Sequence, residues 1–200
     1  GYVYRDDFTR DTRAWELAGS YDSLWSAFDR STSIDQYGGM LFLSSSVYRF
    51  LSPDAHRPWL IILIGALTAA VGVALAWKAA RKGWGEPVAW AAAWIMALYP
   101  EAVLVGGAQL REPFLITFAV MVFWGAVNWS DNWRTSAAWM AGGIAGMLLF
   151  HPGSAVPVIV ITSVWIWIRE RGGRRARWWW IAGGGAAALL AIILFIGAVG

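Results

Sequence analysis

The sequence contains no cysteine, only two histidines and few charged residues for its length. Without cysteine, neither a disulfide framework nor a thiolate metal site can form, and two histidines do not support a histidine-based metal cluster. Charged residues make up 14% of the chain, whereas a soluble domain has about a quarter. The deficit lies after residue 58, where long apolar runs predict an all-α polytopic membrane protein.

The acidic residues that are present are concentrated before the first apolar run. They are interleaved with arginines and comprise Asp6, Asp7, Asp11, Glu16, Asp22, Asp29 and Asp35. We interpret residues 1–58 as an acidic extramembrane domain. Between Met40 and Leu51 apolar residues recur at helical spacing, which is typical of an interfacial helix. A soluble helical hairpin would show the same stripe, and its position beside the spans favours the interface.

Residues 59–200 are predicted to form a transmembrane helical region of about six spans. The expected spans are 59–77, 88–105, 113–129, 135–150, 154–168 and 178–200. The fourth and fifth ranges are short, so they form either two crossings or one re-entrant hairpin. Gly142 and Gly146 form a GxxxG pair that permits close helix approach. Because the chain starts at Gly1 and ends inside an apolar run, we expect an internal piece of a longer protein, with a further span before Gly1.

The basic residues between the spans predict the orientation. They occur in alternate loops, with Lys78, Arg81 and Lys82 in a loop after the first span, followed by Arg134, Arg169, Arg171, Arg174, Arg175 and Arg177. The positive-inside rule makes that face cytoplasmic. We interpret the run 169–177 as a topology determinant rather than a nucleic-acid site. The glycosylation motif at Asn128 then falls on the cytoplasmic face and is discounted.

This orientation places the acidic domain, Glu101, Arg111, Glu112 and His151 together on the outer face of the cell membrane. Asp6 or Asp7 could act there as a general base toward a hydroxyl group, although either could also be a solvated acid beside the membrane. Asp35 is a further candidate base or a helix cap.

Arg111 and its neighbours suit an anionic group. A guanidinium beside a helix N-terminus binds phosphate well, whereas the alternative is a snorkelling arginine paired with Glu112 or Glu101. His151 could bind phosphate or a metal, but a lone histidine in a turn more often has a structural role.

Several segments together resemble a known family. They are Asp35-Gln36-Tyr37-Gly38-Gly39, Tyr48-Arg49-Phe50-Leu51, Ala97-Leu98-Tyr99-Pro100-Glu101 and Gln109-Leu110-Arg111-Glu112-Pro113. In this order, after an acidic outer loop, they resemble bacterial membrane glycosyltransferases of the GT-C fold, in the group related to protein O-mannosyltransferases and the lipid A aminoarabinose transferase. The likeness extends from about Asp6 to Arg177 and depends on order and hydropathy.

The resemblance implies transfer of a sugar from a polyprenyl-phosphate donor to a hydroxyl of a glycan, lipid or protein acceptor on the outer face. Asp7 or Asp6 takes the position of the catalytic base. Arg111, with Glu112 and His151 beside it, takes that of the donor-phosphate site. We expect Gln36, Tyr37 and Glu101 to contact substrate. No cofactor is required, and no residue pattern supports a divalent metal.

Two other classes of function remain open from the residues alone. A transporter or channel subunit would account for the spans and for Glu101 after a proline-broken helix. A non-catalytic membrane scaffold would account for the glycine-rich spans. Neither explains why acidic residues gather in one segment before the spans.

Overall fold

The computed structural model describes residues 5–29, 38–99 and 109–170. Within these ranges the chain is all-helical, with seven α-helices, one short 3₁₀ helix and no strand. The elements are α1 (Arg5–Gly19), η1 (Leu24–Phe28), α2 (Gly39–Leu51), α3 (Trp59–Trp84), α4 (Glu86–Leu98), α6 (Glu112–Val127), α7 (Trp133–Phe150) and α8 (Pro152–Glu170). The predicted all-α class is confirmed for the described part of the chain.

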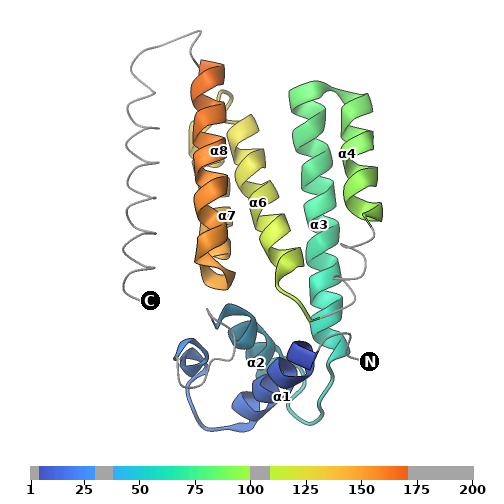
Figure 1. Ribbon diagram of the computed structural model, residues 1–200, viewed down its shortest axis with the longest axis vertical. Coiled ribbons are helices and arrows are strands. Elements are labelled where there is room, and N and C mark those ends of the chain that lie inside the picture. The colour runs from blue at the N-terminus through green and yellow to red at the C-terminus, as the bar shows by residue number, and fades with distance from the viewer. Residues whose placement is uncertain (1–4, 30–37, 100–108, 171–200) are drawn as a thin grey trace.

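The helices form two parts, which Figure 1 shows from the side. Helices α3, α4, α6, α7 and α8 run alongside one another in alternating directions and form a bundle. Helix α6 contacts α3, α7 and α8, while α4 contacts α3. Helices α1, η1 and α2 lie across one end of this bundle, and we call these three elements the end layer.

Five of the six predicted span ranges overlap bundle helices, and prolines and polar caps mark several of the helix ends. Pro113 lies in the first turn of α6 and Pro152 opens α8, where a missing N–H costs nothing. Asn132 caps α7 by accepting a hydrogen bond from the Thr135 amide at 3.3 Å. Helix α4 ends at Leu98, shortly before Pro100, and the predicted continuation of this span to 105 lies largely outside the described residues, as does the span at 178–200.

The loop predicted directly after the first span is wrong. Lys78, Arg81 and Lys82 are not in a loop but form the last turns of α3, which continues to Trp84. Nothing in this stretch breaks a helix until Gly85, whose φ of +92° ends α3 and begins α4. Long basic side chains extend from such a helix end into a polar environment, so charge alone does not mark the boundary.

Glycines let α6 and α7 approach closely, but not at the predicted pair. A Cβ on Gly125 would lie 2.7 Å from a backbone oxygen of α7, and one on Gly143 would lie 2.6 Å from the backbone oxygen of Phe118. Gly146 faces the Phe118 ring, whereas Gly142 has room for a side chain. The GxxxG prediction is therefore correct for Gly146 alone, and Gly143 and Gly125 set the distance between the two backbones.

Two consecutive glycines attach the end layer. Gly38 has a φ of +69° and packs on η1. A Cβ on Gly39 would lie 2.0 Å from the Leu149 backbone oxygen, so α2 touches the end of α7. Met40, Leu41, Val47 and Tyr48 of the α2 stripe are buried in one cluster with α1, η1 and the bundle residues Phe114 and Phe150. Most of the stripe thus packs inside the protein, which differs from the exposed apolar face predicted for an interfacial helix, whereas Leu51 at its end is exposed.

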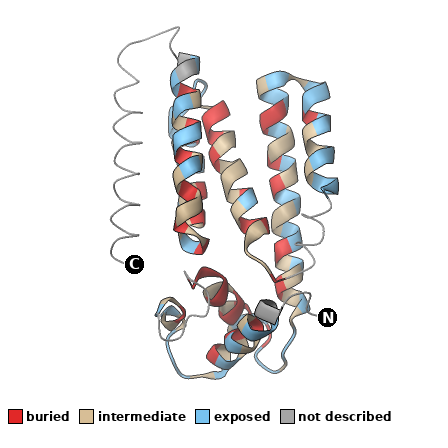
Figure 2. Cartoon of the chain, in the orientation of Figure 1, coloured by how far each residue is buried: buried red, intermediate tan, exposed pale blue. Residues whose placement is uncertain are grey.

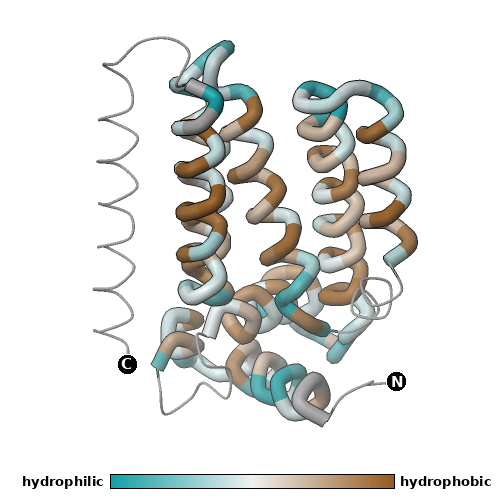
Figure 3. The backbone as a smooth tube through the Cα atoms, turned by 45° about the horizontal axis from the view of Figure 1, so that its top comes forward, coloured by the Kyte–Doolittle hydropathy of each residue, from teal (hydrophilic) through white to brown (hydrophobic). Residues whose placement is uncertain are grey.

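Among the described residues, α3 is the one helix both long and apolar enough to cross a membrane. Helices α4, α6 and most of α8 are apolar but shorter. Figure 3 shows hydrophobic residues along the bundle helices and hydrophilic residues at their turns. Exposed residues lie along the outer sides of α3, α4 and α8 in Figure 2.

Candidate functional site

The end layer lies at the end of the bundle where α6 begins and α7 ends. Phe114 and Phe150 stack there with ring centroids 4.9 Å apart, in one apolar cluster with α1 and α2. The Gln109 side chain, which is buried, donates to the Pro58 carbonyl at 3.2 Å. Arg111, Glu112 and His151 lie within two residues of these side chains in the sequence. The end layer, which includes α1, therefore lies at the same end of the bundle as the start of α6.

A buried carboxylate joins three segments of this layer. Asp11 on α1 is 1% exposed. Its Oδ1 accepts a short hydrogen bond from the Tyr48 hydroxyl on α2. Its Oδ2 lies 2.8 Å from Nε2 of His56, in the loop before α3. Because a carboxylate only accepts, Nε2 carries the hydrogen in this contact.

Aromatic rings surround this contact. The Trp15 ring stacks on His56 at 5.1 Å and meets the Tyr48 ring edge-on at 5.6 Å. The Tyr48 ring in turn meets His56 edge-on at 5.1 Å. The His56 side chain is 33% exposed although its partner Asp11 is fully buried. We call Asp11, Trp15, Tyr48 and His56 the Asp11 cluster.

The sequence contains a pattern that indicates a buried role for Asp11. Selecting candidate acids by their position along the chain misses this pattern. Asp11, Ala14 and Leu17 follow one another at helical spacing, and all three are buried. An acid on the apolar stripe of a helix must find partners inside the protein. The partners themselves come from 37 residues or more away, so no local pattern names them.

Arg49 on α2 joins α2 to the C-terminal end of α1. Its guanidinium donates to the carbonyl oxygens of Leu17 at 2.6 Å, Ala18 at 3.1 Å, Ser20 at 2.9 Å and Asp22 at 3.0 Å. Leu17 and Ala18 are in the last turn of α1, where carbonyls have no intrahelical partners, and Ser20 and Asp22 follow the end of the helix. Arg49 therefore caps α1 from α2, a role that sequence reasoning missed.

The predicted base candidates lie at or beyond the edge of what the structure describes. Asp6 and Asp7 are in the first turn of α1, and their side chains lie outside the described part. Asp7 precedes Asp11 by four residues in the sequence of α1. Asp35 lies outside the described residues, as do Gln36, Tyr37 and Glu101.

The predicted phosphate-site residues surround the start of α6 and the turn between α7 and α8. Arg111 is the N-cap of α6, and Glu112 is in its first turn. Glu112 Oε2 and Arg10 Nε are buried and have no hydrogen-bond partner among the described residues. His151 follows α7, and its Nδ1 accepts from the Ser154 amide at 3.2 Å. This contact gives His151 the structural role of capping α8.

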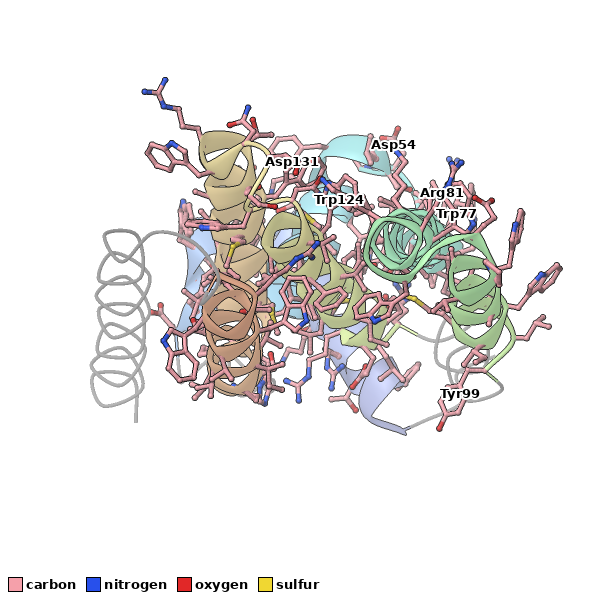
Figure 4. The ribbon with its side chains drawn as sticks, turned by 90° about the horizontal axis from the view of Figure 1, so that it is seen from above. Asp54, Trp77, Arg81, Tyr99, Trp124 and Asp131 are labelled. Atoms are coloured by element: carbon pink, nitrogen blue, oxygen red, sulfur yellow. The ribbon has the colours of Figure 1, made fainter. Side chains whose placement is uncertain are left out.

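The opposite end of the bundle collects the basic residues, and Figure 4 looks down on it. Lys82 donates to Asn128 and forms an ion pair with Asp131, which ties α3 to the loop between α6 and α7. The hydrogen bond from Lys82 lowers the pKa of the Asp131 carboxyl below its usual 3.8. Arg81 pairs with Glu86 at 2.6 Å and lies over the Trp77 ring.

Both the oxygen and the nitrogen of the Asn128 side-chain amide form hydrogen bonds. The oxygen accepts from Lys82, and the nitrogen donates to the Trp124 carbonyl at 2.8 Å.

Within residues 5–29, 38–99 and 109–170, no group of three or more acidic or histidine side chains could hold a metal ion. The chain has no match among known protein families, curated proteins or solved structures. Its function is therefore inferred from its own residues.

Proposed function

We propose that the chain is a polytopic membrane protein whose bundle crosses the bilayer. Large apolar side chains are exposed on several bundle helices, including Leu63, Leu67 and Val71 on α3, Trp90, Trp94 and Ile95 on α4, and Val160, Ile161 and Val164 on α8. Only 22% of the most apolar stretch of α3 is buried inside the protein. Exposed apolar surface on this scale indicates contact with lipid or a partner, and its spread over three helices favours lipid.

The charge distribution supports the orientation of this proposal. Lys78, Arg81, Lys82, Arg134 and Arg169 lie at the end of the bundle away from the end layer. In membrane proteins such residues mark the cytoplasmic side. The end layer, with the acidic residues of α1, is then on the outer face.

We infer that the protein transfers a sugar from a polyprenyl-phosphate donor to an acceptor hydroxyl at that outer face. One observation carries this inference: α1, whose first turn contains Asp6 and Asp7, lies across the end of the bundle where α6 begins after its N-cap residue Arg111. An acid and a cation at one membrane surface are the two groups that this reaction needs. Gln36, Tyr37 and Glu101 are the proposed substrate contacts.

The chemistry is a substitution at the anomeric carbon of the sugar. The acceptor oxygen forms the new bond to that carbon, and the bond from the carbon to the phosphate oxygen breaks. The electron pair leaves with the polyprenyl phosphate, while the hydroxyl proton passes to Asp7 or Asp6 as general base. Arg111 and the N-terminal end of α6 stabilise the charge on the departing phosphate. These groups perform the reaction without a cofactor.

Two buried polar atoms support a polar ligand near this end. A buried hydrogen-bonding atom left without a partner costs about 1–3 kcal/mol. Arg10 Nε on α1 and Glu112 Oε2 on α6 are both in this state with respect to the described residues. A phosphate would satisfy the first, and a sugar hydroxyl would satisfy the second.

The test uses the full chain in lipid nanodiscs, with radiolabelled mannose or aminoarabinose on decaprenyl phosphate and a bacterial membrane extract as acceptor. The wild-type protein should move label from the donor to extract components. Asp7→Asn or Asp6→Asn should lower kcat by about 10²–10⁴-fold, which is the range of general base catalysis. Arg111→Gln should weaken both donor binding and turnover.

Asp54→Asn is the matched control, because it makes the same chemical change at an exposed acid in the loop before α3. It should leave transfer unchanged. A wild-type protein that moves no sugar from either donor would contradict the proposal. Solute or ion flux through proteoliposomes by that same inactive protein would favour a transporter instead.

A further inference from the structure

We propose that His56 is a positioning residue, which acts through Asp11 to hold the base-bearing first turn of α1 in place at the end of the bundle where α6 begins. This inference rests on the proposed function. It concerns the Asp11 cluster, of which no member contacts the reacting atoms in that proposal.

The energetics of burial argue that this cluster does more than hold the layer in place. Removing a carboxylate from water costs several kcal/mol, and apolar residues of similar size are often as stable or more so. The end layer already has an apolar contact with the bundle through Met40, Leu41, Phe114 and Phe150. A buried hydrogen bond fixes the relative position of the helices it joins more closely than apolar packing does, because hydrogen bonds require a defined distance and angle.

The contacts of Asp11 fix the position of α1. Asp11 is fixed from two sides, by Tyr48 on α2 and by His56 three residues before α3 starts. Trp15 stacks on the imidazole and sets the plane of the ring. Asp7 precedes Asp11 by four residues on α1, about 6 Å along the helix axis. Rotation or sliding of α1 would therefore displace Asp7 and break the contact between Asp11 and His56.

A displacement of this kind affects turnover more than binding. Reacting groups must lie about 3–3.5 Å apart and aligned, and a misplacement of about 1 Å can cost about 100-fold in rate. The donor phosphate is held by Arg111 on α6, which is part of the bundle and not of α1. Loss of the His56 contact should lower kcat while leaving the donor KM near its wild-type value.

Four variants test this inference in the nanodisc assay. His56→Gln keeps an N–H donor near the position of Nε2, whereas His56→Asn is too short to reach Asp11. We expect kcat to fall about 10–100-fold for His56→Asn and Asp11→Asn, and to stay within about threefold of wild type for His56→Gln. Donor KM should change by less than about twofold in all three. Asp54→Asn, the fourth variant, should match wild type.

A second measurement needs no activity. The chain has no cysteine, so spin labels can be placed at Arg13→Cys on α1 and Ile116→Cys on α6, which are both exposed. The distance distribution between them should be narrow in wild type and His56→Gln, and should shift or broaden in His56→Asn.

The outcomes separate the two proposals. Equal kcat and equal label distances in His56→Asn and wild type would overturn the positioning role, even if Asp7→Asn abolishes transfer. A wild-type protein without transferase activity would sink the proposed function, whereas the label distances would still report whether His56 holds α1. A broad distribution in wild type would also overturn the role.

Discussion

Replacing Arg49 by methionine should loosen α1 without unfolding the bundle. The variant keeps an unbranched apolar stem but removes the group that binds the carbonyls of Leu17, Ala18, Ser20 and Asp22. A hydrogen bond to a charged group contributes about 1.5–3 kcal/mol. The four do not add, because the bond to Asp22 is exposed and water can replace part of the others. We expect a net loss of about 2–4 kcal/mol in the free energy that holds α1 in place.

This loss should be visible in hydrogen exchange measured by mass spectrometry. If α1 exchanges by local opening, a loss of about 2–4 kcal/mol speeds exchange of its amides about 30-fold to 1,000-fold. Peptides from α6 and α7 should keep their wild-type rates. Arg49→Lys is the matched control, since a compact ammonium cannot span four carbonyls, and it should recover part of the protection. Unchanged exchange of α1 in Arg49→Met would refute the capping role, and a uniform increase over the whole chain would refute its local character.

Three further changes have defined outcomes. Gly39→Ala places a Cβ against the Leu149 carbonyl and should separate α2 from the bundle, seen as faster exchange of α2 amides with those of α6 unchanged. Phe150→Ala leaves a cavity beside the buried stack and should cost about 3–5 kcal/mol, measured by chemical unfolding. Because Lys82 lowers the Asp131 pKa, the ion pair stabilises the fold above pH 3.8 and this contribution is lost as pH falls through the lower folded-state value. Lys82→Met should raise that pKa toward 3.8 and reduce the pH dependence, as followed by the Asp131 carboxyl signal in NMR.

The bundle helices were predictable because their ends coincide with residues of strong local preference. Pro113 and Pro152 favour first turns, and the structure begins α6 and α8 beside them. The end of α3 was not predictable from charge. Lys82 looks like a loop residue in the sequence, but its ammonium pairs with Asp131 from a different helical connection. Such a contact stabilises a longer helix and leaves no trace in the local pattern.

For the candidate site too, local sequence patterns predict some features and miss others. The pattern of charges and apolar runs predicts that α1 and the Arg111 segment meet at one end of the molecule. It does not reveal which acid is buried, because the partners of Asp11 are Tyr48 and His56, far along the chain. Tyr48 lies in the stripe predicted to form an interfacial helix, and no local pattern distinguishes His56. The polar contacts between residues far apart in the sequence can therefore be identified only from the three-dimensional structure.

The end layer combines two kinds of contact that differ in what they specify. Apolar packing against Phe114 and Phe150 favours burial but tolerates small shifts, since it is not directional. Close backbone contact at Gly39 and directed hydrogen bonds at Asp11 and Arg49 tolerate little displacement. A layer that only had to cover the bundle would need the first kind alone. Contacts that tolerate little displacement are present at all three of these places. They favour a layer that holds its acidic residues at a defined position, at the end of the bundle where α6 begins.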